Sequence, residues 1–388
     1  MKELIIFAAL SASVFFMGDK ADIQSLESKY GVSIDRAWMG YSITAPVHGE
    51  HPQIAQAKIS SSRAELEQQL QTLYENKISD LEKTFSVKIA RFGTVNETAY
   101  GQMHQTAHAV PVRSPKLGEL YVLEYALEHS EPSQLMNFSR NPAGINIYFL
   151  DQKNPFTATE WGFNSAGKPA VFIEPRLGVT FGHTLEENVM HQLAHNSAYK
   201  LGWNPNESWN WPLAKKLGFE FSGKPHLTEF TLNGHTRTIG SPGPYAWLLK
   251  TSEGFLYRNT QPDLWIRCSK DLIPLDDMGK PVAASKARKL SSDRIREYAL
   301  VKPLSLDFPT PPEVFADALS MFRADRDSRA ELLQISPILY KVVREHDQEE
   351  LDKTYGKGNK VRAVDGTVTE PTLPIIREIR DLEEGVPS

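Results

Sequence analysis

The sequence predicts an α+β protein, because helical and strand-like patterns occupy separate stretches of the chain. Leucines recur at helical spacing from Ser62 to Thr84 among Glu, Gln and Lys, which predicts an amphipathic helix. Two compact apolar runs, INIYFLD at 145–151 and AVFIEP at 170–175, are typical of strands in a sheet covered on at least one face. Helical spacing returns at 311–347, where two helices are expected.

Three further stretches complete the expected order of elements. Residues 119–140 predict another helix, which Pro132 breaks or restarts. Residues 219–290 are dense in Pro, Gly, Trp and Tyr, and the dipeptide at 233–234, Asn-Gly, is a hairpin signal. This stretch is predicted to be a β-rich insertion. From Gln348 to the end the chain is charged and poor in aromatic residues, which predicts loose order.

The N-terminus favours export of the protein. One Lys precedes a mostly apolar run from Leu4 to Phe16, a length typical of a signal peptide and short for a membrane span. We therefore expect a signal peptide at 1–18, a secreted or periplasmic location, and no stable membrane span. A buried N-terminal segment of a cytosolic protein is the alternative. The expected order is then an accessory region at 19–112, a main domain at 113–347 and a tail at 348–388.

Composition limits the classes of function. A 40% hydrophobic and 23% charged composition over 388 residues is ordinary for a globular protein with a sizeable core. The net charge of −5 gives no reason to expect nucleic acid as a partner. The one cysteine, Cys268, excludes an intrachain disulfide framework and a thiolate zinc site. It is expected to be a small buried residue.

Residues 184–203, TLEENVMHQLAHNSAYKLGW, carry two histidines four positions apart. Thr184 and Glu187 match a capping box, so a helix is expected to begin at Leu185. His191 and His195 then lie one turn apart on one face, where both can direct a nitrogen at one metal ion. The pair alone also fits two histidines satisfied by hydrogen bonds.

A second pair of polar residues lies downstream, in EVFADALSMFRADRDSRAELLQISPILYKVV. Glu313 and Asp317 are four positions apart, so their carboxylates share one face of the expected helix. Without a further observation, Glu313 also fits an acidic residue that the helix dipole favours in the first turn.

This downstream segment resembles the C-terminal end of the anthrax-lethal-factor-like zinc metallopeptidases, which are gluzincins. In that family a helix of pattern E-F-F-A-E-A-F is followed by a charged turn and a second helix containing Pro. The resemblance extends more loosely over residues 115–347. It implies a zincin-like domain, with a small sheet, an active-site helix and C-terminal helices, here carrying the β-rich insertion and preceded by an N-terminal helical region.

The resemblance also implies a Zn²⁺ site. His191 and His195 match the two zinc-binding histidines of the family, and Glu313 matches the third ligand. Asp317 stands where the family has a Glu that orients a ligand. Peptides or proteins are the implied partners.

Two positions depart from the family pattern. Zincins place a Glu directly after the first His as the general base, and this chain has Gln192 there. An amide does not titrate near neutral pH and cannot take that proton. The family also has a Tyr seven residues before the ligand Glu, where this chain has Leu306. Tyr298 is the nearby candidate for supporting the oxyanion.

Three functions remain open on the sequence. The first is a zinc-binding pseudopeptidase, in which the metal ligands are intact and hydrolysis is impaired. The second is an active zinc metalloendopeptidase in which another carboxylate, such as Glu186 or Asp317, acts as the base. The third is a metal-free secreted interaction domain.

Overall fold

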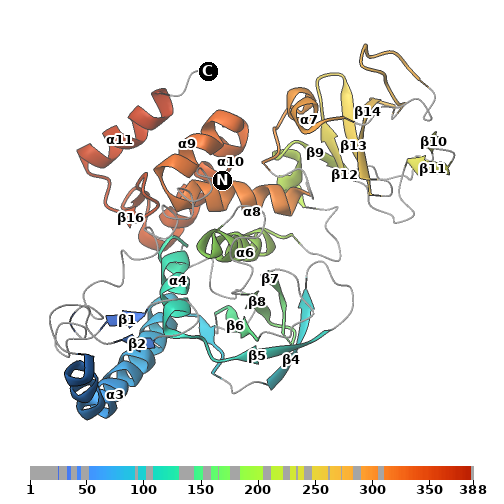
Figure 1. The fold of residues 1–388 in the computed structure, drawn as a ribbon. Coiled ribbons are helices and arrows are strands. Elements are labelled where there is room, and N and C mark those ends of the chain that lie inside the picture. Colours follow the sequence, from blue (N-terminus) through green and yellow to red (C-terminus); the bar gives the residue numbers. More distant parts are fainter. Residues whose placement is uncertain are drawn as a thin grey trace. The chain divides into compact units, whose positions relative to one another are not determined.

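A computed structural model gives the protein mixed α and β structure, as the sequence predicts (Figure 1). It divides into two compact units, 1–196 and 197–388. The residues that the structure describes are residue 25 and 33–35, 42–44, 52–91, 95–101, 108–130, 144–151, 159–164, 166–174, 184–203, 211–221, 228–232, 235–239, 247–260, 263–271, 273–282, 290–304 and 310–385. The expected signal peptide lies outside them. No helix among these residues has the length and apolar character needed to cross a membrane.

The first unit is built on one mixed sheet. Its strands are β3 (Lys88–Ile89), β4 (Val95–Gly101), β5 (His108–Arg113), β6 (Asn146–Leu150), β7 (Glu160–Phe163) and β8 (Pro169–Ile173). They run in the order β3-β6-β5-β4-β7-β8, and β8 pairs back to β6. The sheet therefore closes on itself. The pairing of β6 with β3 and β8 is parallel, and its pairing with β5 is antiparallel.

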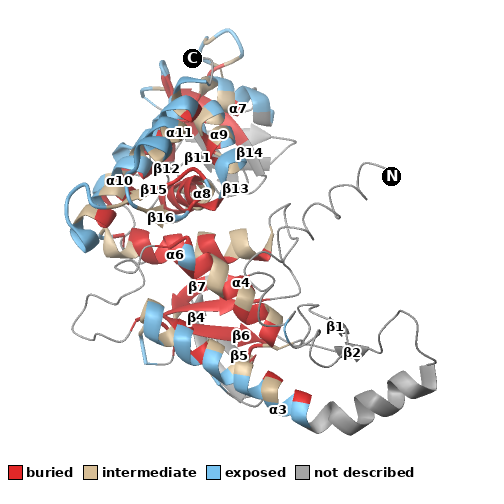
Figure 2. Ribbon diagram, turned by 90° about the vertical axis from the view of Figure 1, so that its left-hand side faces the viewer, coloured by how far each residue is buried: buried red, intermediate tan, exposed pale blue. Residues whose placement is uncertain are grey.

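Strands β6 and β8 form the buried centre of this sheet. Every residue of both strands is buried, and β6 is drawn red, as buried, in Figure 2. This burial explains why both sequences are nearly continuous apolar runs. Tyr148 and Phe172 stack with ring centroids 5.1 Å apart, and Val112 of β5 packs in the same cluster. The sheet thus includes β3 to β5, from a stretch that the sequence predicts to be a separate accessory region.

Two helices precede the central strands of this unit. They are α3 (Pro52–Phe85) and α4 (Leu117–Glu128). Lys77 of α3 binds Glu124 of α4 at 2.6 Å. Buried Glu119 accepts hydrogen bonds from Arg113 and from the backbone N–H of Lys116. The first part of the helix predicted at 119–140 corresponds to α4, and its continuation from residue 131 lies outside the described residues.

A short hairpin, β1 (Ser33–Asp35) and β2 (Ser42–Thr44), lies near the N-terminus.

The second unit contains the predicted β-rich stretch. A short 3₁₀ helix, η4 (Pro212–Lys215), leads into an antiparallel sheet of order β14-β13-β12-β9. Its strands are β9 (Phe219–Phe221), β12 (Trp247–Lys250), β13 (Gly254–Thr260) and β14 (Asp263–Ser269). A separate hairpin joins β10 (Thr228–Leu232) to β11 (His235–Ile239), with Leu232 opposite His235. This register fits the predicted two-residue turn, although Asn233 and Gly234 themselves lie outside the described residues.

The rest of this unit is mainly helical. Its elements are α7 (Ser292–Tyr298), α8 (Pro311–Ala324), α9 (Arg326–Ile335), α10 (Pro337–Tyr355), the hairpin of β15 (Val361–Arg362) and β16 (Val368–Thr369), and α11 (Leu373–Glu384). The sequence predicts two helices over 311–347, whereas the structure has three. Asp325 caps α9 by accepting a hydrogen bond from the Ser328 N–H at 2.8 Å, and Pro337 begins α10.

Residues 349–385 are ordered, with the end of α10, the hairpin of β15 and β16, and α11, although the sequence predicts a loose tail from Gln348. Buried Asp347 of α10 accepts hydrogen bonds from Arg323 of α8 and from Arg362 of β15, at 2.7 and 2.8 Å. The two arginines hold the pKa of Asp347 below its ordinary value, because they stabilise its charged form. These bonds hold the C-terminal hairpin against α8 and α10, which composition alone could not indicate.

Helix α6 (Leu185–Lys200) carries the histidine pair, and both of its ends are capped. At its start the Glu187 carboxylate accepts from the Thr184 N–H at 2.7 Å, and the Thr184 hydroxyl accepts from the Glu187 N–H at 3.2 Å. The predicted capping box is confirmed. At its end Gly202 has φ +88°, and the N–H groups of Gly202 and Trp203 bond to Tyr199 and Ala198. These two bonds form a Schellman motif.

Replacing Thr184 with Ala should lower the free energy of unfolding by about 1 kcal/mol, since it removes one half of the capping box. Urea denaturation followed by circular dichroism measures the change. Thr372→Ala is the matched control, because Thr372 caps α11 without a side-chain hydrogen bond and should have a much smaller effect. Equal losses in the two variants would contradict the capping role of the Thr184 hydroxyl.

Candidate metal centre

The two histidines of α6 direct their Nε2 atoms at each other. These atoms lie 3.0 Å apart, and the rings stand at 80° with centroids 4.7 Å apart. His195 is buried and His191 is half-buried. A hydrogen bond at this distance needs the proton on one Nε2 and the lone pair on the other. The same convergence would let both nitrogens bind one metal ion in place of that proton.

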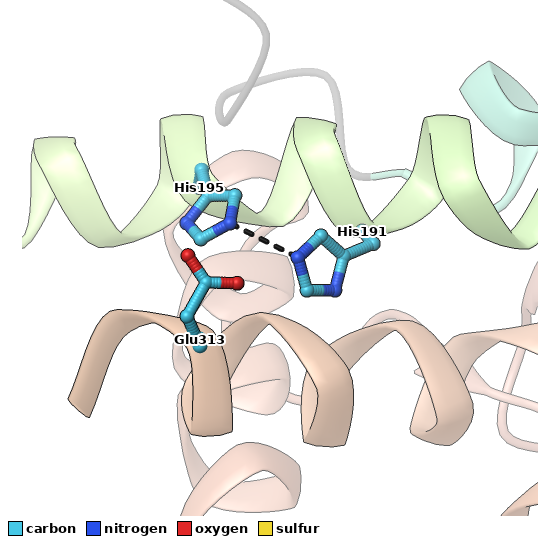
Figure 3. A group of neighbouring side chains, drawn as sticks. All are labelled: His191, His195 and Glu313. Carbon is cyan, nitrogen blue, oxygen red and sulfur yellow. Dashed lines mark hydrogen bonds between the residues drawn. The ribbon is translucent and has the colours of Figure 1, made fainter. Parts of the chain in front are cut away.

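Glu313 supplies a third ligand atom. It lies in the first turn of α8, which Pro311 and Pro312 begin. Ligand atoms of His191, His195 and Glu313 all lie within 4.8 Å of one another. The carboxylate and the two rings face the same point (Figure 3). The structure therefore brings together the three residues that the sequence singles out as metal ligands.

The donor set fits a divalent transition metal. Two imidazole nitrogens and one carboxylate oxygen form the His₂Glu set of many catalytic zinc sites. A tetrahedral ion with bonds of about 2.05 Å separates its ligand atoms by about 3.3 Å, close to the 3.0 Å between the two Nε2 atoms. The donors are not specific to zinc, because imidazole also suits copper, nickel and iron.

Trp211 links the end of α6 to the start of α8 within the second unit. Its indole N–H donates to the carbonyl oxygen of Leu201, directly after α6, at 3.2 Å. Its ring packs edge-on against Phe315, with centroids 5.7 Å apart. Phe315 is fully buried and lies two residues after Glu313. This apolar contact helps to set where the first turn of α8 lies relative to the chain that leaves α6.

Gln192, at the position of the expected general base, has a structural partner. Its side-chain oxygen accepts a hydrogen bond from the backbone N–H of Trp161 on β7 at 2.6 Å. Strand β4 pairs with β7 at Gly162 and Phe163, so Gln192 binds the N–H of the residue just before that pairing. The sequence could not indicate this contact, because 31 residues separate its partners.

Glu186 is badly placed to replace the missing base. At about 100° per residue, it lies about 140° around α6 from His191 and about 180° from His195. Burial raises the pKa of Glu186 to about 7, a value suited to proton transfer. Its position on the opposite face nevertheless removes it from the two imidazoles. Gln192, by contrast, lies within about 100° of both histidines.

Other residues that the sequence singles out have different surroundings. Asp317 lies one turn after Glu313 on α8 and is half-buried. The Tyr298 ring lies at the end of α7, 4.4 Å from the guanidinium carbon of Arg267 on β14. Its oxyanion role stays a prediction, and Leu306 lies outside the described residues. Cys268 is buried, as expected, and burial raises the pKa of its thiol to about 12.

Comparison of the chain with protein-family models, with curated proteins and with solved structures finds no match. The functional assignment therefore depends on the chain's own residues and on their geometry.

Gln192→Ala should lower the free energy of unfolding by about 1–3 kcal/mol. The substitution removes the side-chain oxygen that accepts a hydrogen bond from the backbone N–H of Trp161 in strand β7. Gln192→Glu keeps an acceptor of the same length and should retain wild-type stability within about 1 kcal/mol. Urea denaturation of the three proteins at neutral pH measures both changes. A Gln192→Ala protein as stable as wild type would contradict the structural role of this amide.

Proposed function

We propose that the protein binds one zinc ion through His191, His195 and Glu313, as a member of the lethal-factor-like metallopeptidase type. The observation that carries the proposal is the convergence of two imidazoles and one carboxylate, all with ligand atoms within 4.8 Å. The sheet of the first unit, which closes through the pairing of β6 with β8, does not by itself indicate a zincin-like domain. The proposal therefore depends on the ligand set and on the sequence resemblance.

We further propose that hydrolysis of peptide bonds is impaired, which makes the protein a pseudopeptidase. When bound, zinc would polarise a carbonyl oxygen and lower the pKa of a water molecule. A side chain must still take the proton, and the Gln192 amide cannot do so. General-base catalysis contributes on the order of 10²- to 10⁴-fold to a rate. Binding of a peptide or protein, without efficient cleavage, is then the main activity.

A working metallopeptidase is the second candidate, and Asp317 is the residue that favours it. On α8, Asp317 lies only about 40° around the helix axis from Glu313, so both carboxylates share one face. It would have to act across one helical turn from the ligand. If it instead orients Glu313, its loss should weaken metal binding by about 10- to 100-fold. A secreted or periplasmic location is part of either proposal and depends on the apolar run at Leu4–Phe16.

Metal analysis tests the binding proposal. Purified wild-type protein, dialysed against trace zinc, should retain about one equivalent by mass spectrometry. His191→Ala and Glu313→Ala should each lose most of it, whereas the exposed-carboxylate control Glu331→Ala should not. Wild-type protein that keeps less than about a tenth of an equivalent would contradict the zinc site and favour the metal-free interaction domain. If wild-type protein does retain zinc, competition with nickel and copper establishes which metal the site prefers.

A peptide-library cleavage assay tests the second part of the proposal. Zinc-loaded wild-type protein should cleave slowly or not at all, and Gln192→Glu should raise the rate by about 10²- to 10⁴-fold by restoring a proton acceptor. Asp317→Asn tests the alternative. If Asp317 is the base, wild-type protein should cleave, Gln192→Glu should add nothing, and Asp317→Asn should abolish cleavage without loss of zinc. These three results together would contradict the pseudopeptidase proposal.

A further inference from the structure

The C-terminal part of the second unit contains a cavity that the metal centre does not use. It has a volume of about 280 Å³ and lies among α9, α10, β15 and α11. These elements lie together in the C-terminal part of the chain, drawn orange to red (Figure 1). Its charged lining residues are Arg329, Arg344, Arg362, Arg380, Asp347 and Glu383. Arginines therefore outnumber carboxylates around this cavity by four to two.

The one buried carboxylate of the cavity is already neutralised. Asp347 binds Arg362 through both of its carboxylate oxygens, at 2.8 and 3.0 Å, and it also binds Arg323, which lies outside the lining. All three side chains are at most 3% exposed. Asp347 therefore has no capacity to balance a further guanidinium.

Arg329 is the further guanidinium. It is 1% exposed, and its hydrogen bonds go to backbone carbonyl oxygens, Nε to Phe322 at 2.8 Å and Nη1 to Arg362 at 3.4 Å. Among the described residues, none accepts a hydrogen bond from its buried Nη2. Burial, with Arg362 nearby, lowers the pKa of Arg329 to about 10. The guanidinium carbon also lies 4.3 Å from the centre of the Phe322 ring, a contact that offsets part of the cost of burial. A buried cation without a directly bonded acid is still costly, and an anion in the cavity would lower that cost.

The opposite side of the cavity is also rich in arginine. Arg344 of α10 and Arg380 of α11 are more than half exposed. Glu383 of α11 binds Arg344 at 3.0 Å and accepts the Tyr340 hydroxyl hydrogen bond at 2.7 Å. Among the lining residues on this side, one carboxylate thus accompanies two guanidinium groups. Arg380 pairs with Glu384 only at 3.9 Å, which leaves it able to turn toward an anion.

We propose that this cavity binds a small phosphate-bearing anion, held by Arg329 at its buried side and by Arg344 and Arg380 at its exposed side. Planar guanidinium groups bind phosphate oxygens in pairs, which makes arginine the usual residue for such sites. The volume lies just below the range of about 300–1,000 Å³ typical of sites for drug-sized ligands. It therefore suits phosphate or a small phosphomonoester and not a nucleotide.

Titration calorimetry and thermal unfolding of the full-length protein test this proposal, with inorganic phosphate as the probe. Phosphate should bind in one equivalent and raise Tm in a concentration-dependent way, since a ligand of the folded state stabilises it. Sodium chloride at matched ionic strength should give no comparable shift. Acetate, tested in parallel, shows whether the cavity prefers phosphate or accepts any small anion. Acetate that binds as tightly as phosphate would overturn the phosphate assignment.

Variants show whether the arginines are responsible. Arg344→Ala and Arg380→Ala should each weaken phosphate binding by about tenfold, the effect of one lost charge-assisted hydrogen bond. Arg377→Ala is the matched control, because Arg377 is an exposed arginine of α11 outside the lining of this cavity. Arg329→Gln should abolish binding. If Arg329→Gln does not fold, the two exposed-side variants decide the outcome.

Two results would overturn the proposal. One is an absence of saturable phosphate binding to the folded wild-type protein. The other is binding that Arg344→Ala and Arg380→Ala weaken no more than Arg377→Ala does. The zinc content of these variants should equal that of wild type, so failure of this proposal is distinguishable from failure of the metal centre.

Discussion

The fixed register of helix α6 is the constraint on which the candidate metal centre depends. Two imidazoles can converge on one point only if the helix holds them one turn apart without slipping. The capping box at Thr184 and the Schellman motif at Gly202 determine where this helix begins and ends. Between those ends, the helical period determines which side chains share the face of His191 and His195. The same period turns Glu186 away from them.

In the proposed site, metal binding and proton transfer depend on different residues. The groups proposed to bind the metal are two imidazoles and one carboxylate, a donor set that holds zinc in many proteins. Proton transfer would depend on residue 192, whose amide accepts a hydrogen bond from the backbone of β7. Since Glu has the same length as Gln, the fold itself would accommodate either residue. An exchange between Gln and Glu at this position would therefore change the proposed chemistry without requiring any change in packing.

Elements whose signals are local in the sequence could be predicted. The start of α6, the buried strands β6 and β8, and the pairing of β10 with β11 follow from capping residues, apolar runs and a turn dipeptide. The face shared by His191 and His195 follows from their spacing. Features that depend on distant partners could not be predicted, because no local pattern encodes them. These include the closure of the sheet through β6 and β8, the contact of Gln192 with Trp161, and the order of the C-terminal segment.

The buried ion pairs of the C-terminal segment also affect how fast this segment folds. Its buried ion pairs join residues close in the chain, with separations of 24 residues for Arg323 and Asp347 and 15 for Asp347 and Arg362. Short separations cost little entropy to close, and chains rich in such contacts fold quickly. The sheet of the first unit must instead join strands β3 and β6, whose paired residues Lys88 and Asn146 are far apart in the sequence. On these grounds the C-terminal helices and hairpin should become ordered before that sheet closes.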